Sequence, residues 1–158
     1  MRRPKQHGAQ PRAMLICCQG GHFMQMLALK SAWEDLPHVW VTTRAADTEA
    51  LLGDDPAVFA HVPTARNIKN MFRNLWLAAV VIRRHRPDVL LSTGGGVTVP
   101  LFLVGKLVGA RLIYVESLTR VDGPSLTGKL VYPLVDRFFV QWPEAATRPR
   151  MEFVGNLL

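Results

Sequence analysis

The sequence has little cysteine and no long apolar run. Its two cysteines, Cys17 and Cys18, are adjacent, and neighbouring cysteines rarely form a disulfide without strain. A disulfide framework and a cysteine-based metal site are therefore excluded, and a reducing compartment such as the cytosol is favoured. Because no stretch of about 18 apolar residues occurs, no conventional membrane-spanning helix is expected. The apolar run at 13–18 is also too short for the core of a signal peptide.

Acidic residues are missing from two segments that hold much of the positive charge. The formal net charge is +7 over 158 residues. Four basic residues lie within 1–12 and six within 66–87, and neither segment contains an acid. Such local charge favours an anionic surface or ligand as a partner. Residues 1–12 are expected to form a flexible basic tail, and the length of 13–158 suits one domain.

Short apolar runs alternate with longer helical patterns along the rest of the chain. Strands are expected at 13–18, 39–43, 58–62, 88–92, 111–116 and 137–141. Helices are expected between them at 22–35, 48–52, 67–85, 97–108 and 124–135. This alternation predicts an α/β fold, a Rossmann-like open parallel sheet with helices on both faces. In such sheets ligands bind beyond the carboxyl ends of the strands, so the loops at those ends are the candidate sites.

Glycines follow two of the predicted strands where the chain must turn. They are Gly20 and Gly21 after the first strand, and Gly94, Gly95 and Gly96 after the fourth. Glycine lets the backbone approach a ligand closely, and the N–H groups at the start of the next helix attract an anion. The two loops are therefore candidate phosphate-binding sites. The alternative is that each glycine run only connects a strand to a helix.

Two ionisable residues belong to the same edge of the predicted sheet. His22 follows the first glycine loop and is a candidate acid, base or phosphate ligand; the alternative is an ordinary surface histidine at a helix start. Glu116 ends the fifth predicted strand and points toward the same region. Its carboxylate either takes part in catalysis or accepts backbone N–H bonds and holds the next loop in shape.

The predicted helix at 67–85 combines an apolar centre with cationic ends. Arg73 and Trp76 lie toward its first half, and Arg83, Arg84 and Arg86 lie at its end. Apolar, aromatic and cationic positions of this kind suit a membrane interface with anionic lipids, so these five residues are candidate membrane contacts. The alternative is a core helix whose last-turn arginines complement the helix dipole.

Several ligand classes lack their sequence signals. The dinucleotide fingerprint G-x-G-x-x-G is absent, and the second predicted strand is followed by Arg44 rather than by an acid for a ribose. A nicotinamide-dependent enzyme is therefore disfavoured. No nucleic-acid partner is expected, because the cations cluster with an apolar helix rather than with stacking aromatics. No cofactor and no metal ion are expected.

A longer block of sequence resembles a known family. The segment from Ser92 to Glu144 contains Ile-Tyr-Val-Glu-Ser at 113–117 and Pro-Ser-Leu-Thr-Gly-Lys at 124–129. Together with Gln-Gly-Gly-His at 19–22 and Phe-Val-Gly-Asn-Leu-Leu at 153–158, it resembles the Alg-fourteen-type oligosaccharide biosynthesis family. Bacterial members of that family include PssD-type exopolysaccharide glycosyltransferase subunits. The resemblance covers about residues 14–158.

This resemblance implies half of an enzyme. Such proteins are similar to the N-terminal, acceptor-binding half of MurG-like glycosyltransferases of the GT-B type. They sit at the cytoplasmic face of a membrane and recruit a small catalytic subunit of the GT-B C-terminal type, which supplies most of the nucleotide-sugar site. The pair transfers a sugar from a UDP-sugar, such as UDP-N-acetylglucosamine, to a polyprenol-diphosphate-linked saccharide acceptor. The chain end is then expected where a single-chain relative crosses into its second domain.

The resemblance also implies roles for the loop residues. The acceptor diphosphate would be bound by Gly20, Gly21, Gly94, Gly95 and Gly96, and the catalytic residues would be His22 and Glu116. The sequence departs from MurG-like enzymes in two places, with Cys18-Gln19 in place of further glycines and Val115 in place of a histidine. We therefore expect the chain to be inactive without its partner.

Membrane attachment is expected to be peripheral or monotopic. Eukaryotic members of the family carry an N-terminal anchor, whereas this sequence shows only a basic tail. The alternative function is a non-catalytic membrane anchor or scaffold, which recruits and orients the partner while the partner performs all the chemistry.

Overall fold

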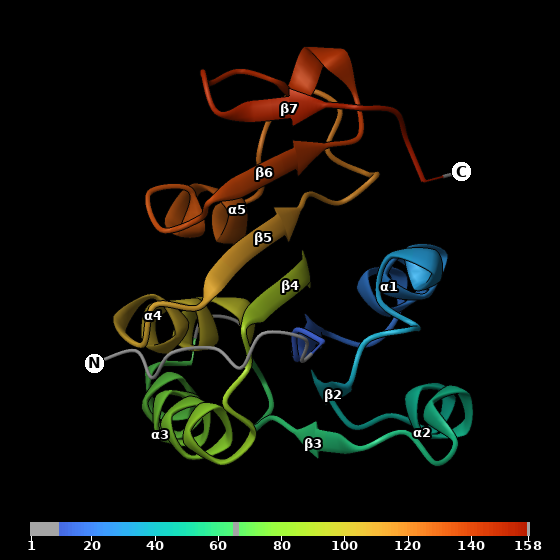
Figure 1. Cartoon of the computed structure of the whole chain (residues 1–158). Coiled ribbons are helices and arrows are strands. Elements are labelled where there is room, and N and C mark those ends of the chain that lie inside the picture. Colours follow the sequence, from blue (N-terminus) through green and yellow to red (C-terminus); the bar gives the residue numbers. More distant parts are fainter. Residues whose placement is uncertain (1–9, 65–66, 158) are drawn as a thin grey trace.

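The computed structural model describes residues 10–64 and 67–157. Seven parallel strands form one sheet in the order β3-β2-β1-β4-β5-β6-β7 (Figure 1). They are β1 (Ala13–Cys17), β2 (His38–Thr42), β3 (Ala57–Phe59), β4 (Val89–Gly94), β5 (Arg111–Val115), β6 (Arg137–Val140) and β7 (Met151–Phe153). The predicted Rossmann-like parallel sheet is confirmed.

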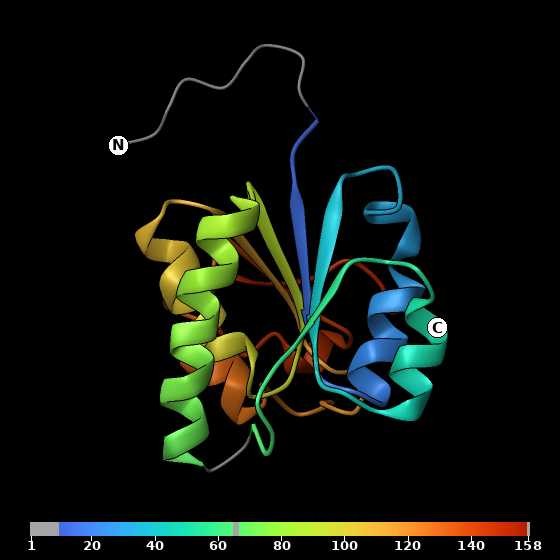
Figure 2. The ribbon, with the colours of Figure 1, turned by 90° about the horizontal axis from the view of Figure 1, so that it is seen from below.

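Helices cover both faces of the sheet. They are α1 (Gly21–Ala28), α2 (Ala46–Leu52), α3 (Ile68–His85), α4 (Thr98–Leu107) and α5 (Leu126–Val131), with short 3₁₀ turns at Lys30–Ala32 and Pro143–Ala145. Viewed along the layers, α1 and α2 lie on one side, and α3, α4 and α5 lie on the other (Figure 2). The α4 helix ends before Gly109, whose positive φ of 76° is the glycine conformation expected just past a helix.

The alternation of side chains along β1 explains the two-sided core. All five residues of β1 are buried, and successive side chains of a strand point to opposite faces. Met14 and Ile16 belong to the cluster that includes Phe102 of α4. Leu15 and Cys17 belong to the other cluster, together with Phe23 of α1. A strand buried on both faces reads as a continuous apolar run, which is why this one was visible in the sequence.

The strand order reverses direction between β1 and β4. β1 pairs with β2 on one side and with β4 on the other. The chain therefore leaves the carboxyl ends of these neighbouring strands toward opposite faces of the sheet, which leaves room for a ligand between the two loops. The register shifts after Ile16 and brings Cys17 opposite Gly94, so both glycine loops begin at this point.

Some elements differ from the sequence prediction. β7 was not predicted, because it has three residues and only Met151 is buried. The helix predicted at 22–35 ends as α1 at Ala28. The indole of Trp33 donates to the carbonyl of Met26 at 3.0 Å and packs on Trp40 with ring centroids 5.2 Å apart, so the chain turns to bury Trp33 instead of continuing the helix.

Most of the predicted basic tail lies outside the described residues, and so does Arg66 of the basic segment 66–87. Positions 1–9, Arg66 and the chain end at 158 are not described. Arg12 was assigned to the flexible tail, but its N–H donates to the Asp88 carboxylate at 3.1 Å and its carbonyl accepts the Asp88 N–H at 2.8 Å. Arg12 therefore belongs to the ordered start of the fold.

Candidate functional site

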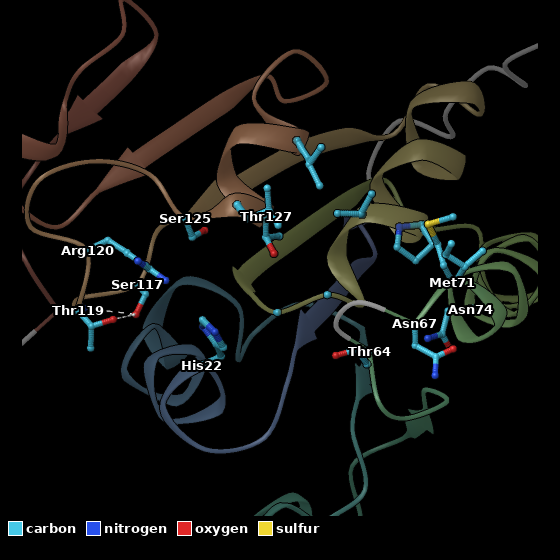
Figure 3. A pocket seen from close by; sticks show the side chains of 17 residues that line it. His22, Thr64, Asn67, Met71, Asn74, Ser117, Thr119, Arg120, Ser125 and Thr127 are labelled. Atoms are coloured by element: carbon cyan, nitrogen blue, oxygen red, sulfur yellow. Dashed lines mark hydrogen bonds between the residues drawn. The ribbon is translucent and has the colours of Figure 1, made fainter.

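A pocket of about 660 Å³ lies beyond the carboxyl ends of β1, β4 and β5. The polar residues His22, Ser117, Thr119 and Arg120 occupy one end, and Asn67, Met71 and Asn74, from α3 and its N-cap, occupy the other (Figure 3). Apolar residues of the three helices on this face complete the wall: Ile68, Val99, Pro100, Leu126 and Leu130. The pocket thus has one polar end and one largely apolar side.

His22 lines the pocket at the start of α1 and is fixed by β4. Its Nδ1 lies 2.8 Å from the carbonyl oxygen of Thr93, and the Thr93 hydroxyl donates to the His22 carbonyl at 2.6 Å. Because a carbonyl only accepts hydrogen bonds, Nδ1 must carry the hydrogen. In the neutral ring, Nε2 then presents its lone pair as a proton acceptor. The geometry suits a base.

The second glycine loop is packed too tightly for any side chain. A Cβ at Gly94 would lie 2.8 Å from the His22 ring. A Cβ at Gly95 would overlap Cys18 Sγ, and one at Gly96 would overlap the Thr64 carbonyl. Gly94 and Gly95 also have φ values of 119° and 95°, where side chains are disfavoured. The absence of side chains lets the loop backbone pack directly against His22, Cys18 and Thr64. Gly95 and Gly96 line the pocket, so the loop backbone forms part of its wall.

The first glycine loop is open by comparison. Gly20 has a φ of 76°, and a Cβ at Gly20 or Gly21 would meet no atom within 4 Å. Neither residue is among those that line the pocket. Their predicted binding of a diphosphate stays a prediction, and the space beside them leaves room for a ligand or a partner.

Glu116 is fully buried, and its carboxylate organises the loop after β5. Oε1 accepts the Ser117 N–H at 2.9 Å and the Tyr114 hydroxyl at 3.3 Å. Oε2 accepts the N–H and the hydroxyl of Ser125 at 2.9 and 3.0 Å. These contacts match the loop-holding alternative. Glu116 is not among the pocket-lining residues, and a catalytic role for it stays a prediction.

Two buried groups near the site are poor acids. Burial raises the pKa of the Tyr114 phenol well above its usual range, and the Glu116 carboxylate raises it further. Burial also raises the pKa of the Cys17 thiol to about 12, although a hydrogen bond to Thr42 opposes the change. Neither group is therefore suited to lose a proton at neutral pH.

Gly128 of α5 closes over the Glu116 carboxylate. A Cβ there would overlap Glu116 Oε2 and lie 3.1 Å from Phe138. We expect Gly128→Ala to lower the free energy of unfolding by about 2 kcal/mol, because neither the hydrogen-bonded carboxylate nor the buried ring has room to move. Urea denaturation checks this. Gly21→Ala is the matched control and should change stability by less than about 1 kcal/mol, since its Cβ would enter open space. Equal stabilities for the two variants would contradict the packing argument.

Sequence reasoning missed two residues that line the pocket, Asn74 of α3 and Arg120 of the loop after β5. The Asn74 side chain holds the β3–α3 connection in place. Its Oδ1 accepts the His61 N–H at 2.8 Å, and its Nδ2 donates to the His61 carbonyl at 3.0 Å. No sequence signal marks this contact. Arg120 had a signal, because it is the only basic residue between Glu116 and Gly128.

The outward surface of α3 bears both apolar and basic side chains. Phe72 and Trp76 are 62% and 74% exposed, and each of the predicted membrane contacts Arg73, Arg83, Arg84 and Arg86 is exposed. Among residues 10–64 and 67–157, none of these four arginines forms an ion pair with an acid. Their charges are thus available to an anionic surface.

Two features are absent from the described part of the chain. None of its helices has both the length and the apolar character needed to cross a membrane. No cluster of three or more histidine, cysteine, aspartate or glutamate side chains there is placed to hold a metal ion.

Comparison with known proteins establishes the family. A sequence profile described as "Oligosaccharide biosynthesis protein Alg14 like" matches residues 13–157, which include the pocket and all seven strands. The chain belongs to the Alg14-like family. It is 33% identical to the UDP-N-acetylglucosamine transferase subunit alg14 of Schizosaccharomyces pombe, over 92% of this chain and 83% of that protein. It is 32% identical to the corresponding subunit of Candida albicans, over 91% and 77%.

The fold of this Alg14-like chain is also found in a longer solved enzyme. The structure superposes on MurG of Acinetobacter baumannii with a TM-score of 0.74, at 15% sequence identity, over 89% of this chain. The aligned region is 45% of that MurG chain, so the chain spans less than half of its length. At this identity the likeness concerns the fold alone.

Proposed function

We propose that the chain is the acceptor-binding subunit of a two-part glycosyltransferase, and that a catalytic partner supplies the UDP-N-acetylglucosamine. One observation carries the proposal: an Alg14-like chain has, at the strand-order reversal of its sheet, a pocket with a polar end and an apolar side. A polyprenol-diphosphate saccharide has the same division. Its sugar and diphosphate are polar and its isoprenoid chain is apolar.

The apolar side suits the isoprenoid chain. Ile68 and Leu126 are 72% and 66% exposed, and Met71 and Leu130 are also exposed. Covering such side chains with lipid removes apolar surface from water, at about 25 cal/mol per Å². Ile68 and Met71 begin the helix that also carries Phe72 and Trp76, so a lipid leaving the pocket along α3 would reach that apolar surface next.

His22 is the proposed base. Nε2 would take the proton of the acceptor hydroxyl while the hydroxyl oxygen bonds to the anomeric carbon of the donor sugar. The bond between that carbon and the phosphate oxygen breaks, and UDP leaves with the electron pair. One direct displacement of this kind inverts the anomeric centre. Thr93 keeps Nδ1 protonated and the ring in place.

The glycine loops and Glu116 play supporting roles in this proposal. Gly94, Gly95 and Gly96 bring the start of α4 to the pocket, where its N–H groups favour the acceptor diphosphate. Gly20 and Gly21 would do the same at the start of α1. Glu116 acts as a positioning residue, because it fixes the loop that carries Ser117.

The catalytic partner is inferred from the relatives. Both fungal proteins are named as subunits of a UDP-N-acetylglucosamine transferase, and the chain aligns with less than half of a MurG chain. A small subunit that resembles the other half of a GT-B enzyme would complete the site. The decisive experiment mixes the purified chain, its partner, radiolabelled UDP-N-acetylglucosamine and a polyprenol-diphosphate saccharide. The proposal requires transfer by the pair and none by either chain alone. Full transfer by the partner alone would refute it.

The α3 surface is proposed to bind the cytoplasmic face of a membrane. Phe72→Ala combined with Trp76→Ala should weaken binding to vesicles at least tenfold, since each large apolar side chain contributes about 1.5–3 kcal/mol when buried.

Arg83→Gln combined with Arg84→Gln should weaken binding to anionic vesicles by about tenfold or more, at roughly 1 kcal/mol per cation, and should hardly affect binding to neutral vesicles. Cosedimentation measures both.

A control variant separates this effect from general loss of apolar surface. Val154 is 75% exposed and directly follows β7, the edge strand at the opposite end of the sheet from α3 (Figure 1). Val154→Ala should bind vesicles as the wild type does. If none of the α3 substitutions changes the affinity for vesicles, the membrane contact lies elsewhere on the chain.

The same surface favours a second candidate function. A chain with an exposed apolar and basic helix can serve as a membrane anchor that only recruits and orients its partner. The two candidates differ in the pocket: an anchor does not need His22, whereas a shared active site does.

A further inference from the structure

Arg120 brings a permanent positive charge to the pocket, and it has no role in the function argued above. Among the described residues that line the pocket, Arg120 is the only lysine or arginine, and none is an aspartate or a glutamate. Glu116 lies behind the loop with its carboxylate oxygens occupied by four hydrogen bonds. The charged side chain that lines the pocket therefore favours an anion.

The charge of Arg120 is free to meet a ligand. In the described part of the chain, Arg120 forms no ion pair, and Asp122 two residues away forms none with it. An unpaired guanidinium keeps its planar set of five N–H donors, which matches the oxygens of a phosphate.

The turn that carries Arg120 is held in place from three directions. The Arg120 N–H donates to the Ser117 carbonyl at 2.9 Å. The indole of Trp142 donates to the Leu118 carbonyl at 2.7 Å, and the hydroxyls of Ser117 and Thr119 lie 3.0 Å apart. With Glu116 fixing Ser117, the backbone under Arg120 is ordered before any ligand arrives, which reduces the entropy lost on binding.

One hydroxyl beside Arg120 can donate to the same anion. Ser117 and Thr119 line the pocket, and because their hydroxyls bond to each other, one hydroxyl hydrogen is left for a ligand, whereas the Ser125 hydroxyl donates to Glu116. Figure 3 shows Arg120 beside Ser117 and Thr119 at the end of the pocket away from α3. Arg120 thus lies at the opposite end of the pocket from Met71 of α3. A ligand that reaches from Arg120 to the exposed Met71 and Ile68 has an anionic group at one end and an apolar group at the other.

We propose that Arg120 binds the diphosphate of the acceptor lipid and so determines which end of that lipid enters the pocket. The inference rests on the proposed function for the identity of the lipid. Diphosphate chemistry is shared by the acceptor and by the UDP part of the donor, and the position of Arg120 at the opposite end of the pocket from the exposed Met71 of α3 favours the acceptor.

The test in the assembled pair compares Michaelis constants for the two substrates. Arg120→Gln should raise KM for the acceptor about tenfold or more, since a charge-assisted hydrogen bond to phosphate is lost, and should leave KM for UDP-N-acetylglucosamine within about twofold of wild type. Arg120→Lys keeps the charge without the planar fork and should recover part of the loss. Arg111→Gln is the control, because Arg111 is exposed at the opposite, amino end of β5; it should behave as wild type.

A binding measurement keeps the inference independent of transferase activity. The purified full chain in detergent is titrated with geranylgeranyl diphosphate and, separately, with geranylgeraniol. Tight binding of the diphosphate, weakened about tenfold by Arg120→Gln and unchanged by Arg111→Gln, supports the inference even if the pair transfers no sugar. The inference is overturned if Arg120→Gln changes neither the KM for the acceptor nor the affinity for the diphosphate. It is also overturned if Arg120→Gln raises only the KM for the UDP-sugar. Thermal unfolding checks that the variant is folded.

Discussion

Replacing His22 by alanine should lower sugar transfer by the assembled pair about 10²–10⁴-fold, the usual contribution of a positioned base. The Nδ1 contact with Thr93 leaves Nε2 as the proton acceptor, and no other histidine is found among the described residues that line the pocket. Because the loss occurs in the transition state, kcat should fall while KM for either substrate changes little. Initial rates at saturating acceptor measure the effect.

The matched control for His22 is His61. It is partly buried before α3 and does not line the pocket, and its contacts with Asn74 use only backbone atoms. His61→Ala should therefore transfer sugar at close to the wild-type rate. Gel filtration of each variant with the partner shows whether the complex survives. An intact His22→Ala complex with wild-type activity would remove His22 from the chemistry and favour the anchor function.

Replacing Glu116 by alanine should lower the free energy of unfolding by about 3 kcal/mol or more, since a buried donor left without a partner costs about 1–3 kcal/mol. The two backbone donors, Ser117 and Ser125, cannot rotate toward other acceptors. Glu116→Gln should also destabilise the fold, because its amide cannot accept the bonds that both carboxylate oxygens now accept. Chemical denaturation gives the free energies, and hydrogen exchange at Ser117 and Ser125 locates the loss.

An exposed glutamate provides the comparison. Glu152 pairs with Arg137 at 2.7 Å on the surface, and exposed pairs contribute at most about 1 kcal/mol. Glu152→Ala should therefore be close to neutral. If Glu116→Ala keeps wild-type stability and loses only transfer activity, Glu116 takes part in the chemistry and its positioning role is wrong.

The sequence predicts the sheet well because its signals there are local. The apolar run of β1 and the glycines at 20–21 and 94–96 mark a buried parallel strand and two turns, and all three appear where expected. The end of α1 was predicted poorly, since it depends on where the Trp33 side chain packs. β7 was missed because its three residues, Met-Glu-Phe, are too few for an alternating pattern to mark a strand.

The pocket is predicted only in part for a related reason. Gly95, Gly96 and His22 follow strands, so topology alone brings them to one edge. Thr64 comes from the β3–α3 connection and Asn74 comes from α3, and only the contacts of Thr64 with Gly96 and of Asn74 with His61 bring them there. Glu116 was found, but whether a carboxylate at a strand end faces a ligand or a neighbouring loop depends on donors nine residues away, at Ser125.

The most direct test of the central claim is acceptor binding by this chain without its partner. The purified full chain is titrated in detergent with a radiolabelled polyprenol-diphosphate saccharide, and unlabelled UDP-N-acetylglucosamine and unlabelled acceptor serve as competitors. The account predicts saturable binding that the unlabelled acceptor displaces and UDP-N-acetylglucosamine does not. No binding by this chain, together with full acceptor binding by the partner alone, would contradict it.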